Sequence, residues 1–307
     1  MRMARYKIGE LGSYYVRSRL RPEMAGWGER ECAGALALMR RVADFSGVQL
    51  VDAVVLPREI QLLVRLDPRE EVPDEELVRR YRVLMEGEEV GYLGYDGDRL
   101  AELLAAGGEG AEKLRVRLRS RMQDLSAFMK TLKQRLTMSY NRRHGRIGGG
   151  SLWRDRFEST LVQERASIYG VYREHVQTAP ARAGLVEEAS AYPHAYRMED
   201  EPTAYEEQRV WRRKRAARWD PVARVADSMI PPYLSLRGGR PPLPEWDEWL
   251  ARAVVAGTAS FVRKHARRWR KQGKTTALAE TEDATELRAA RPHRCGTGAE
   301  APSSGPG

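Results

Sequence analysis

The sequence predicts an α+β fold in which an antiparallel sheet carries helices on one face. Within residues 12–20, from Tyr14 onward, Tyr14, Val16 and Leu20 fall on one face and Arg17 and Arg19 on the other, which is typical of a half-buried strand. Residues 29–46 repeat apolar side chains at helical spacing. Residues 49–56 and 60–66 are strongly apolar and are separated by Pro57, which indicates two consecutive strands. The predicted order is therefore strand, helix, strand and strand.

The next part of the chain adds helices, an insertion and one more strand. Residues 74–86 are predicted as a polar helix, and residues 87–109, rich in Gly, Asp and Glu, as a loop-bearing insertion. Residues 111–139 are predicted as one long amphipathic helix, which the glycines that follow bring to an end. A strand at 152–162 and a helix at 164–177 complete an arrangement whose opening is ferredoxin-like.

Three segments are expected along the chain. Residues 1–200 form the α+β domain. Residues 201–274 are predicted as a helical, basic extension, with helices at 203–219 and 245–271. Residues 275–307 lose apolar content and are predicted to be a disordered tail.

Composition narrows the class of protein. The 307 residues carry a formal net charge of +10, with a pI of about 9.7. A basic excess of this size favours a polyanionic partner, most often nucleic acid, over a merely soluble basic protein. The two cysteines, Cys32 and Cys295, lie far apart, which excludes a disulfide scaffold or a cysteine-based zinc site. Without a long apolar run or a signal-peptide core, the chain is expected to be cytoplasmic and not membrane-bound.

Nearly all of the net positive charge is accounted for by residues 112–158, where thirteen Lys or Arg stand against four Asp or Glu. Because a solvated helix face normally mixes both signs, this bias favours contact with phosphates, and aromatic residues among the cations offer stacking or packing surfaces. The candidate DNA-binding residues are Lys130, Lys133, Arg135, Tyr140, Arg142, Arg143, Trp153, Arg154 and Arg156. A second cluster without acids, from Arg263 to Lys274, is either another phosphate-contacting surface or a solvated helix.

Several sequence blocks occur in the order known from one protein family. Within residues 125–162 stand Tyr-Asn-Arg-Arg-His-Gly and then Leu-Trp-Arg-Asp-Arg-Phe-Glu-Ser. Residues 179–186 read Ala-Pro-Ala-Arg-Ala-Gly-Leu-Val, and 191–193 read Ala-Tyr-Pro. These blocks resemble the signature of REP-associated tyrosine transposases, which belong to the single-tyrosine HUH superfamily. The resemblance covers most of residues 5–200.

The resemblance implies a ferredoxin-like HUH domain that acts on single-stranded DNA, often at hairpins, and that forms a homodimer. In the family, two histidines on one strand hold a divalent metal, which polarises the scissile phosphate. A tyrosine then attacks and forms a covalent phosphotyrosine link. The two ligands stand at i and i+2, so they project from the same face of the strand.

This chain departs from the family at the positions that carry the chemistry. Glu59 and Gln61 occupy the two histidine positions. Their oxygens can bind a hard cation such as Mg²⁺, but they can equally be two polar residues on an open sheet face. The tyrosine position aligns with His175, which cannot form a phosphotyrosine, and Ala179 replaces the family's asparagine. Tyr172, one helical turn before His175, is either a substitute nucleophile or a core residue.

Three functions compete at this point. The first is a transposase-like protein that binds single-stranded or hairpin DNA without the tyrosine strand-transfer chemistry and without a cofactor. The second is an active nickase in which Glu59, Gln61 and His175 hold Mg²⁺ or Mn²⁺, with Tyr172 or a water molecule as nucleophile. The third is protein–protein interaction through the tryptophan-rich segment 200–274.

Overall fold

The structure, a computed structural model, describes residues 7–68, 71–86, 94–146, 149–200, 254–271, 276–280 and 288–292. An eight-stranded sheet in the order β5-β2-β3-β1-β4-β6-β8-β7 forms the centre of this part of the chain. The strands are β1 (Gly12–Arg19), β2 (Gln49–Leu56), β3 (Glu59–Leu66), β4 (Glu158–Val162), β5 (Ala195–Arg197), β6 (Val255–Gly257), β7 (Thr276–Glu280) and β8 (Arg288–Pro292). Neighbouring strands run antiparallel, except that β4 and β6 pair in parallel.

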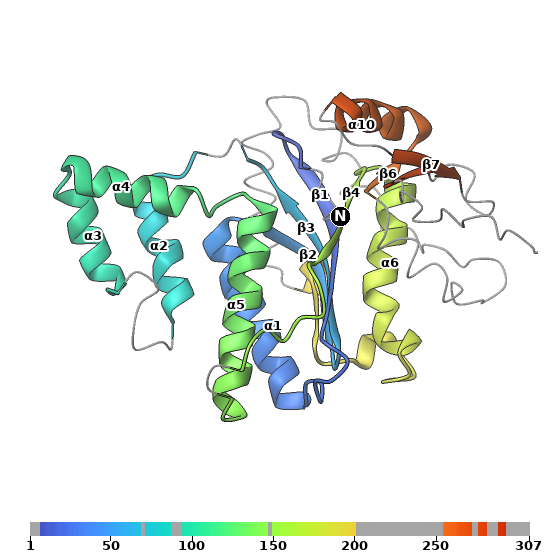
Figure 1. Ribbon diagram of the computed structural model, residues 1–307, viewed down its shortest axis with the longest axis horizontal. Helices are drawn as coiled ribbons and strands as arrows, with labels where there is room; N and C mark the ends of the chain where they lie inside the picture. The colour runs from blue at the N-terminus through green and yellow to red at the C-terminus, as the bar shows by residue number, and fades with distance from the viewer. Residues whose placement is uncertain are drawn as a thin grey trace, which may run out of the picture.

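Helices cover both faces of this sheet (Figure 1). They are α1 (Glu29–Ser46), α2 (Asp74–Met85), α3 (Gly97–Ala105), α4 (Gly108–Arg119), α5 (Leu125–Arg143), α6 (Ala166–Arg182) and α10 (Ala259–Lys271), with short 3-10 turns η1 (Ala189–Ala191) and η2 (Met198–Asp200). Figure 1 shows α1 and α5 on one face, α6 on the other, and α2, α3 and α4 projecting beyond α1 and α5. The predicted α+β fold class is confirmed, with the difference that α6 covers the face expected to lack helices.

Two apolar layers explain why both faces are covered. Val16 and Leu62 belong to the layer beneath α1 and α5. Tyr15 and Leu63, their neighbours along the two strands, belong to a second layer that includes Tyr172 of α6. Side chains alternate between faces along a strand, so a strand with apolar residues in both registers must be covered twice. The prediction of a half-buried first strand was therefore wrong, because β1 is buried on both faces.

The stretch predicted as one helix at 111–139 is two helices, α4 and α5. The break centres on Gln123, which has a positive φ of 52°. Its side chain accepts a hydrogen bond from the backbone N–H of Asp67 at 2.7 Å and donates to the carbonyl of Gly47 at 2.6 Å. Asp124 then caps α5 by accepting from the N–H of Ala127 at 2.8 Å. These bonds join residues far apart in the sequence, so the periodicity of apolar residues does not predict them. They fix where α5 begins.

Three further expectations differ from the structure. The segment predicted as a loop-bearing insertion, 87–109, contains α3, capped by Asp96, and the start of α4. Of the extension predicted to be helical, residues 201–253 lie outside the described residues, and the described part includes a strand, β6, as well as α10. The tail predicted to be disordered, 275–307, contributes β7 and β8. Strand β8 pairs with both β6 and β7, and this pairing satisfies backbone hydrogen-bonding groups of these strands.

Candidate functional site

Glu59 and Gln61 lie on the face of β3 that α6 covers. The amide Nε2 of Gln61 donates to Oε1 of Glu59 at 2.5 Å. From the neighbouring strand β1, the hydroxyl of Tyr15 donates to Oε1 of Gln61 at 3.3 Å. The same hydroxyl is hydrogen-bonded to Nε2 of His175 on α6, also at 3.3 Å. We refer to Glu59, Gln61, Tyr15 and His175 as the polar cluster.

Tyr15 connects three positions that the sequence had selected separately, yet sequence reasoning missed it. The alternation of β1 placed Tyr14 and Val16 in the core, so Tyr15 was left on the opposite face with no assigned role. The position of Tyr15 in the pairing of β1 with β3 is the signal that could have identified it as a neighbour of Gln61. Tyr15 stands across from Leu63 on β3, two residues beyond Gln61 on the same face. Only the position of α6 brings His175 to the same hydroxyl.

Burial determines the protonation of the two candidate reactive residues on α6. His175 is 3% exposed. This burial, together with the nearby charges of Arg182 and Arg17, holds the pKa of His175 well below its usual value, so the imidazole is neutral. Tyr172 is fully buried, and this burial raises the pKa of its phenol. In this conformation Tyr172 keeps its proton and is not accessible to a substrate.

The arginines of β1 next to the polar cluster are paired with a carboxylate. Nε of Arg17 lies 2.9 Å from Glu158, and Nη2 of Arg19 lies 3.1 Å from the other oxygen of the same carboxylate. Burial lowers the pKa of Arg17, but the nearby Tyr15, Glu158 and Glu59 raise it by more, so its guanidinium remains charged. The cations nearest to the predicted metal positions therefore have their own anionic partner.

The arrangement of the polar cluster is suited to hydrogen bonding within the protein. Gln61 accepts from Tyr15 and donates to Glu59, so both ends of its amide are engaged. Within the described residues, no group of three His, Cys, Asp or Glu side chains is placed to hold a metal ion. A cation between Glu59 and Gln61 would have to displace the bond that joins them. In this arrangement the residues present do not fit a divalent cation.

Buried ion pairs hold α6 against the sheet. Arg173 contacts Asp52 of β2 at 2.7 Å, and Gln177 donates to the same carboxylate at 2.8 Å. Near the other end of the helix, Arg65 of β3 lies 2.9 Å from Glu164. Because buried charges are tolerated where they are paired, these contacts fix the register of α6 over the sheet. They thereby place His175 above Tyr15.

The two aromatic residues among the DNA-binding candidates are packed inside the protein. Trp153 is 6% exposed, lies edge-on against Trp27 with ring centroids 5.7 Å apart, and donates from Nε1 to the carbonyl of Lys133 at 3.1 Å. Tyr140 is 5% exposed and stacks on His144 at 4.1 Å. Their faces are used for packing, so of the two roles open to them, the structure favours packing over stacking on bases.

Five of the basic candidates remain exposed around α5 and the segment before β4. We call Lys130, Arg142, Arg143, Arg154 and Arg156 the α5 surface. The helix and the segment are joined, because Nζ of Lys133 donates to the carbonyl of Asp155 at 2.9 Å. Lys133 also lies over the Trp153 ring, at 4.8 Å, and Arg135 donates to the carbonyl of Leu84 at 3.4 Å. Lys133 and Arg135 are thus partly buried and engaged with the protein itself.

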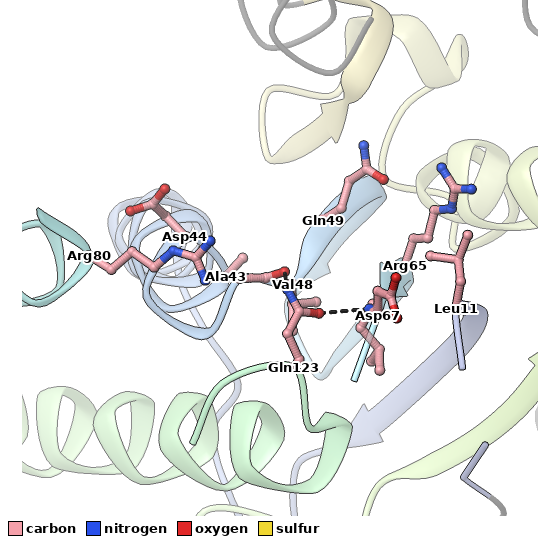
Figure 2. Close-up of a pocket in the computed structure, with 11 residues that line it drawn as sticks. Leu11, Ala43, Asp44, Val48, Gln49, Arg65, Asp67, Arg80 and Gln123 are labelled. Carbon is pink, nitrogen blue, oxygen red and sulfur yellow. Dashed lines mark hydrogen bonds between the residues drawn. The ribbon is translucent and has the colours of Figure 1, made fainter. Parts of the chain in front are cut away.

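A pocket lies away from all of these residues. It has a volume of about 240 Å³ and lies where α1 ends, β2 begins and β3 ends (Figure 2). Its wall includes Gln123 and Asp67, which the dashed line in Figure 2 joins. Glu59 and Gln61 lie at the opposite end of β3. The pocket therefore includes no residue that the sequence predicted for the site.

Comparisons with known proteins find a distant structural similarity for this chain. Its sequence matches no known family and no curated protein. Among solved structures, it is similar to a REP-associated tyrosine transposase bound to a REP hairpin, with 13% sequence identity and a TM-score of 0.40. The match covers 64% of this chain and 81% of the other. At this distance membership of that family is not established.

In the described part of the chain, no helix combines the length and the apolar character needed to cross a bilayer.

Proposed function

We propose that this chain is a DNA-binding protein that binds single-stranded or hairpin DNA along the α5 surface and does not perform tyrosine strand transfer. One observation carries the proposal. The α5 surface gathers five exposed cations around one helix and the segment next to it. Within the described residues, Arg154 lies 3.5 Å from Asp155 and the other four form no ion pair.

Lys130, Arg142, Arg143 and Arg156, which form no ion pair with other described residues, are available to phosphates. Neutralising each phosphate releases condensed counterions, so a surface of this kind supplies affinity that falls steeply with salt. Because Trp153 and Tyr140 are packed inside, base stacking contributes little to this binding. Phosphate contacts position a nucleic acid without encoding its sequence, so we expect weak sequence preference at the α5 surface.

The polar cluster supports the second half of the proposal. His175 stands where the resembling family has its nucleophile, and it is neutral, buried and bonded to Tyr15. Tyr172 is fully buried. A nucleophile must reach the scissile phosphate and lose its proton, and neither condition holds for these side chains in this conformation.

A fluorescent DNA hairpin with Mg²⁺ or Mn²⁺, run on native and denaturing gels, tests both halves of the proposal. We expect a shifted band on the native gel and an unchanged DNA length on the denaturing gel. No shift at 0.1 M salt would contradict DNA binding. A nick, or a protein–DNA adduct that survives denaturation, would contradict the absence of chemistry.

The second candidate function is a metal-dependent nickase. One observation supports it. Glu59, Gln61 and His175 are linked through Tyr15, so carboxylate, amide and imidazole groups meet in one space. Rearranged around Mg²⁺ or Mn²⁺, Glu59 and Gln61 would supply oxygen ligands. A metal-dependent nick that disappears in Glu59→Ala but persists in Glu112→Ala, a matched change on α4, would support this function. An equal rate in the two variants would remove it.

A homodimer and a cytoplasmic location remain predictions of the resemblance and of the composition. Of the five tryptophans proposed as a protein interface, Trp211, Trp219, Trp246 and Trp249 lie outside the described residues, and Trp269 belongs to α10.

A further inference from the structure

A second basic surface lies on α10. The helix contains no Asp or Glu, and its described side chains that carry positive charge are all exposed. We call these residues the α10 surface: Arg263, Lys264, Arg267, Arg268 and Lys271. Arg268 of this surface pairs with Glu10, a residue of another segment, at 3.2 Å. The helix therefore presents a strongly positive outer face.

The inner face of α10 is already occupied by the protein. Val262 is fully buried and His265 is 1% exposed. The ring of Phe261 lies 4.4 Å from the ring of His265. A helix that binds a membrane surface needs a free apolar face to insert between lipids. On α10 that face is buried, so the exposed cations fit a polyanion that is recognised by charge.

Arg268 of the α10 surface and Arg154 of the α5 surface lie at opposite ends of β1. Arg268 pairs with Glu10, just before β1 begins. At the other end, the backbone N–H of Arg154 donates to the carbonyl of Arg19, the last residue of β1, at 3.0 Å. Eight residues of extended strand span about 25 Å at a rise of ~3.4 Å per residue. In Figure 1, α10 lies at one end of the sheet and α5 ends at the other.

We propose that the α10 surface is a second phosphate-binding surface, which holds the backbone of a separate nucleic-acid segment from the one bound at the α5 surface. The inference rests on the proposed function of the α5 surface as a DNA-binding site. Arg268 and Arg154 are separated by the length of β1, about 25 Å. A stem of five base pairs extends only about 17 Å at 3.4 Å per pair, so one short stem is expected to occupy one surface and leave the other available. The protein can therefore hold two strands, or two parts of one long strand, at once.

Native mass spectrometry with a hairpin of five base pairs measures the number of hairpins bound per chain. We expect two for the wild-type protein and one for Lys264→Glu/Arg267→Glu, with the dissociation constant of the remaining hairpin within twofold. Arg142→Glu/Arg154→Glu should also bind one hairpin. The matched control is Arg99→Glu/Lys113→Glu, the same charge change at exposed sites on α3 and α4. This control should still bind two.

Each outcome supports or contradicts hairpin binding at one of the two surfaces. A wild-type ratio of one, or a ratio of two that Lys264→Glu/Arg267→Glu leaves unchanged, overturns the second surface. If Arg142→Glu/Arg154→Glu instead leaves the ratio unchanged while the α10 variant lowers it, the proposed function of the α5 surface fails and the α10 surface stands. Vesicles with anionic lipid form a parallel arm. Vesicle binding that depends on Lys264 and Arg267, without loss of a hairpin, would identify a membrane partner and overturn the inference.

Discussion

The polar cluster beneath α6 and the α5 surface both contain residues that the sequence had singled out, yet most of the cluster is buried and the α5 surface is exposed. In the cluster, Gln61 and His175 are buried and each is hydrogen-bonded to Tyr15. On the α5 surface, Arg142 and Arg156 stay exposed and form no ion pair with the described residues. Polar groups in a protein interior must be satisfied by the protein, whereas exposed cations remain available to a partner. Changes in the first region should therefore alter stability, and changes in the second should alter binding.

The largest expected effect concerns Trp153, a predicted DNA contact that the fold places in the core. Trp153→Ala should lower the free energy of unfolding by about 3–5 kcal/mol, because it removes a buried indole and leaves a cavity. Chemical denaturation measures this loss, and hairpin affinity of the folded protein should change by less than twofold. Arg156→Ala is the neighbouring control, with little effect on stability. Weakened binding at unchanged stability would show that Trp153 stacks on bases after all.

Reversal of charge on the α5 surface should give the next largest effect. Arg142→Glu/Arg154→Glu should weaken hairpin binding roughly 100-fold and lower the slope of log affinity against log salt by about one to two units. Fluorescence anisotropy over a salt series measures both quantities. All variants are made in the background Lys264→Glu/Arg267→Glu, so that α10 does not contribute to the measured hairpin affinity. If Arg142→Glu/Arg154→Glu binds the hairpin as tightly as Arg99→Glu/Lys113→Glu in the same background, the α5 surface does not bind DNA.

His265 sharpens the comparison, because it is a buried titratable group directly beneath an exposed cationic face. Burial first, and then the charges of Lys264 and Arg268, lower the pKa of His265 to about 4. Between pH 6.5 and pH 4, His265 is protonated in the unfolded chain but stays neutral in the folded chain. The free energy of unfolding therefore falls as pH falls from 6.5 towards 4. The wild-type protein should lose about 2 kcal/mol more than His265→Gln between pH 7.5 and pH 5. Parallel pH profiles of the two proteins would contradict this assignment.

The smallest expected effect tests the hydroxyl at the centre of the polar cluster. Tyr15→Phe removes the hydrogen bonds to Gln61 and His175 and should cost about 1–2 kcal/mol of stability, since both partners remain buried. Thermal and chemical denaturation measure this cost. Tyr140→Phe is the matched control, because the hydroxyl of Tyr140 makes no hydrogen bond to another described residue. Equal stability of the two variants would mean that the cluster contributes nothing to the fold.

Much of the candidate site was predictable residue by residue, but its geometry was not. The spacing of Glu59 and Gln61 placed both side chains on one face of a strand, as observed. Their connection to His175 required the long-range pairing of β1 with β3 and the position of α6. Tyr15 was missed because strand alternation identifies which residues share a face, but does not say which helix will cover that face.

The sequence by itself determined the α+β class, the opening order of strand, helix, strand and strand, and the concentration of positive charge around α5. Each of these depends on local periodicity or on composition, which the chain carries before it folds. The tertiary structure decided that Trp153 and Tyr140 are buried while Arg142 and Arg154 are exposed, and that Arg268 and Arg154 lie at opposite ends of β1. Burial and separation in space depend on which distant segments pack together, and no local pattern encodes that choice.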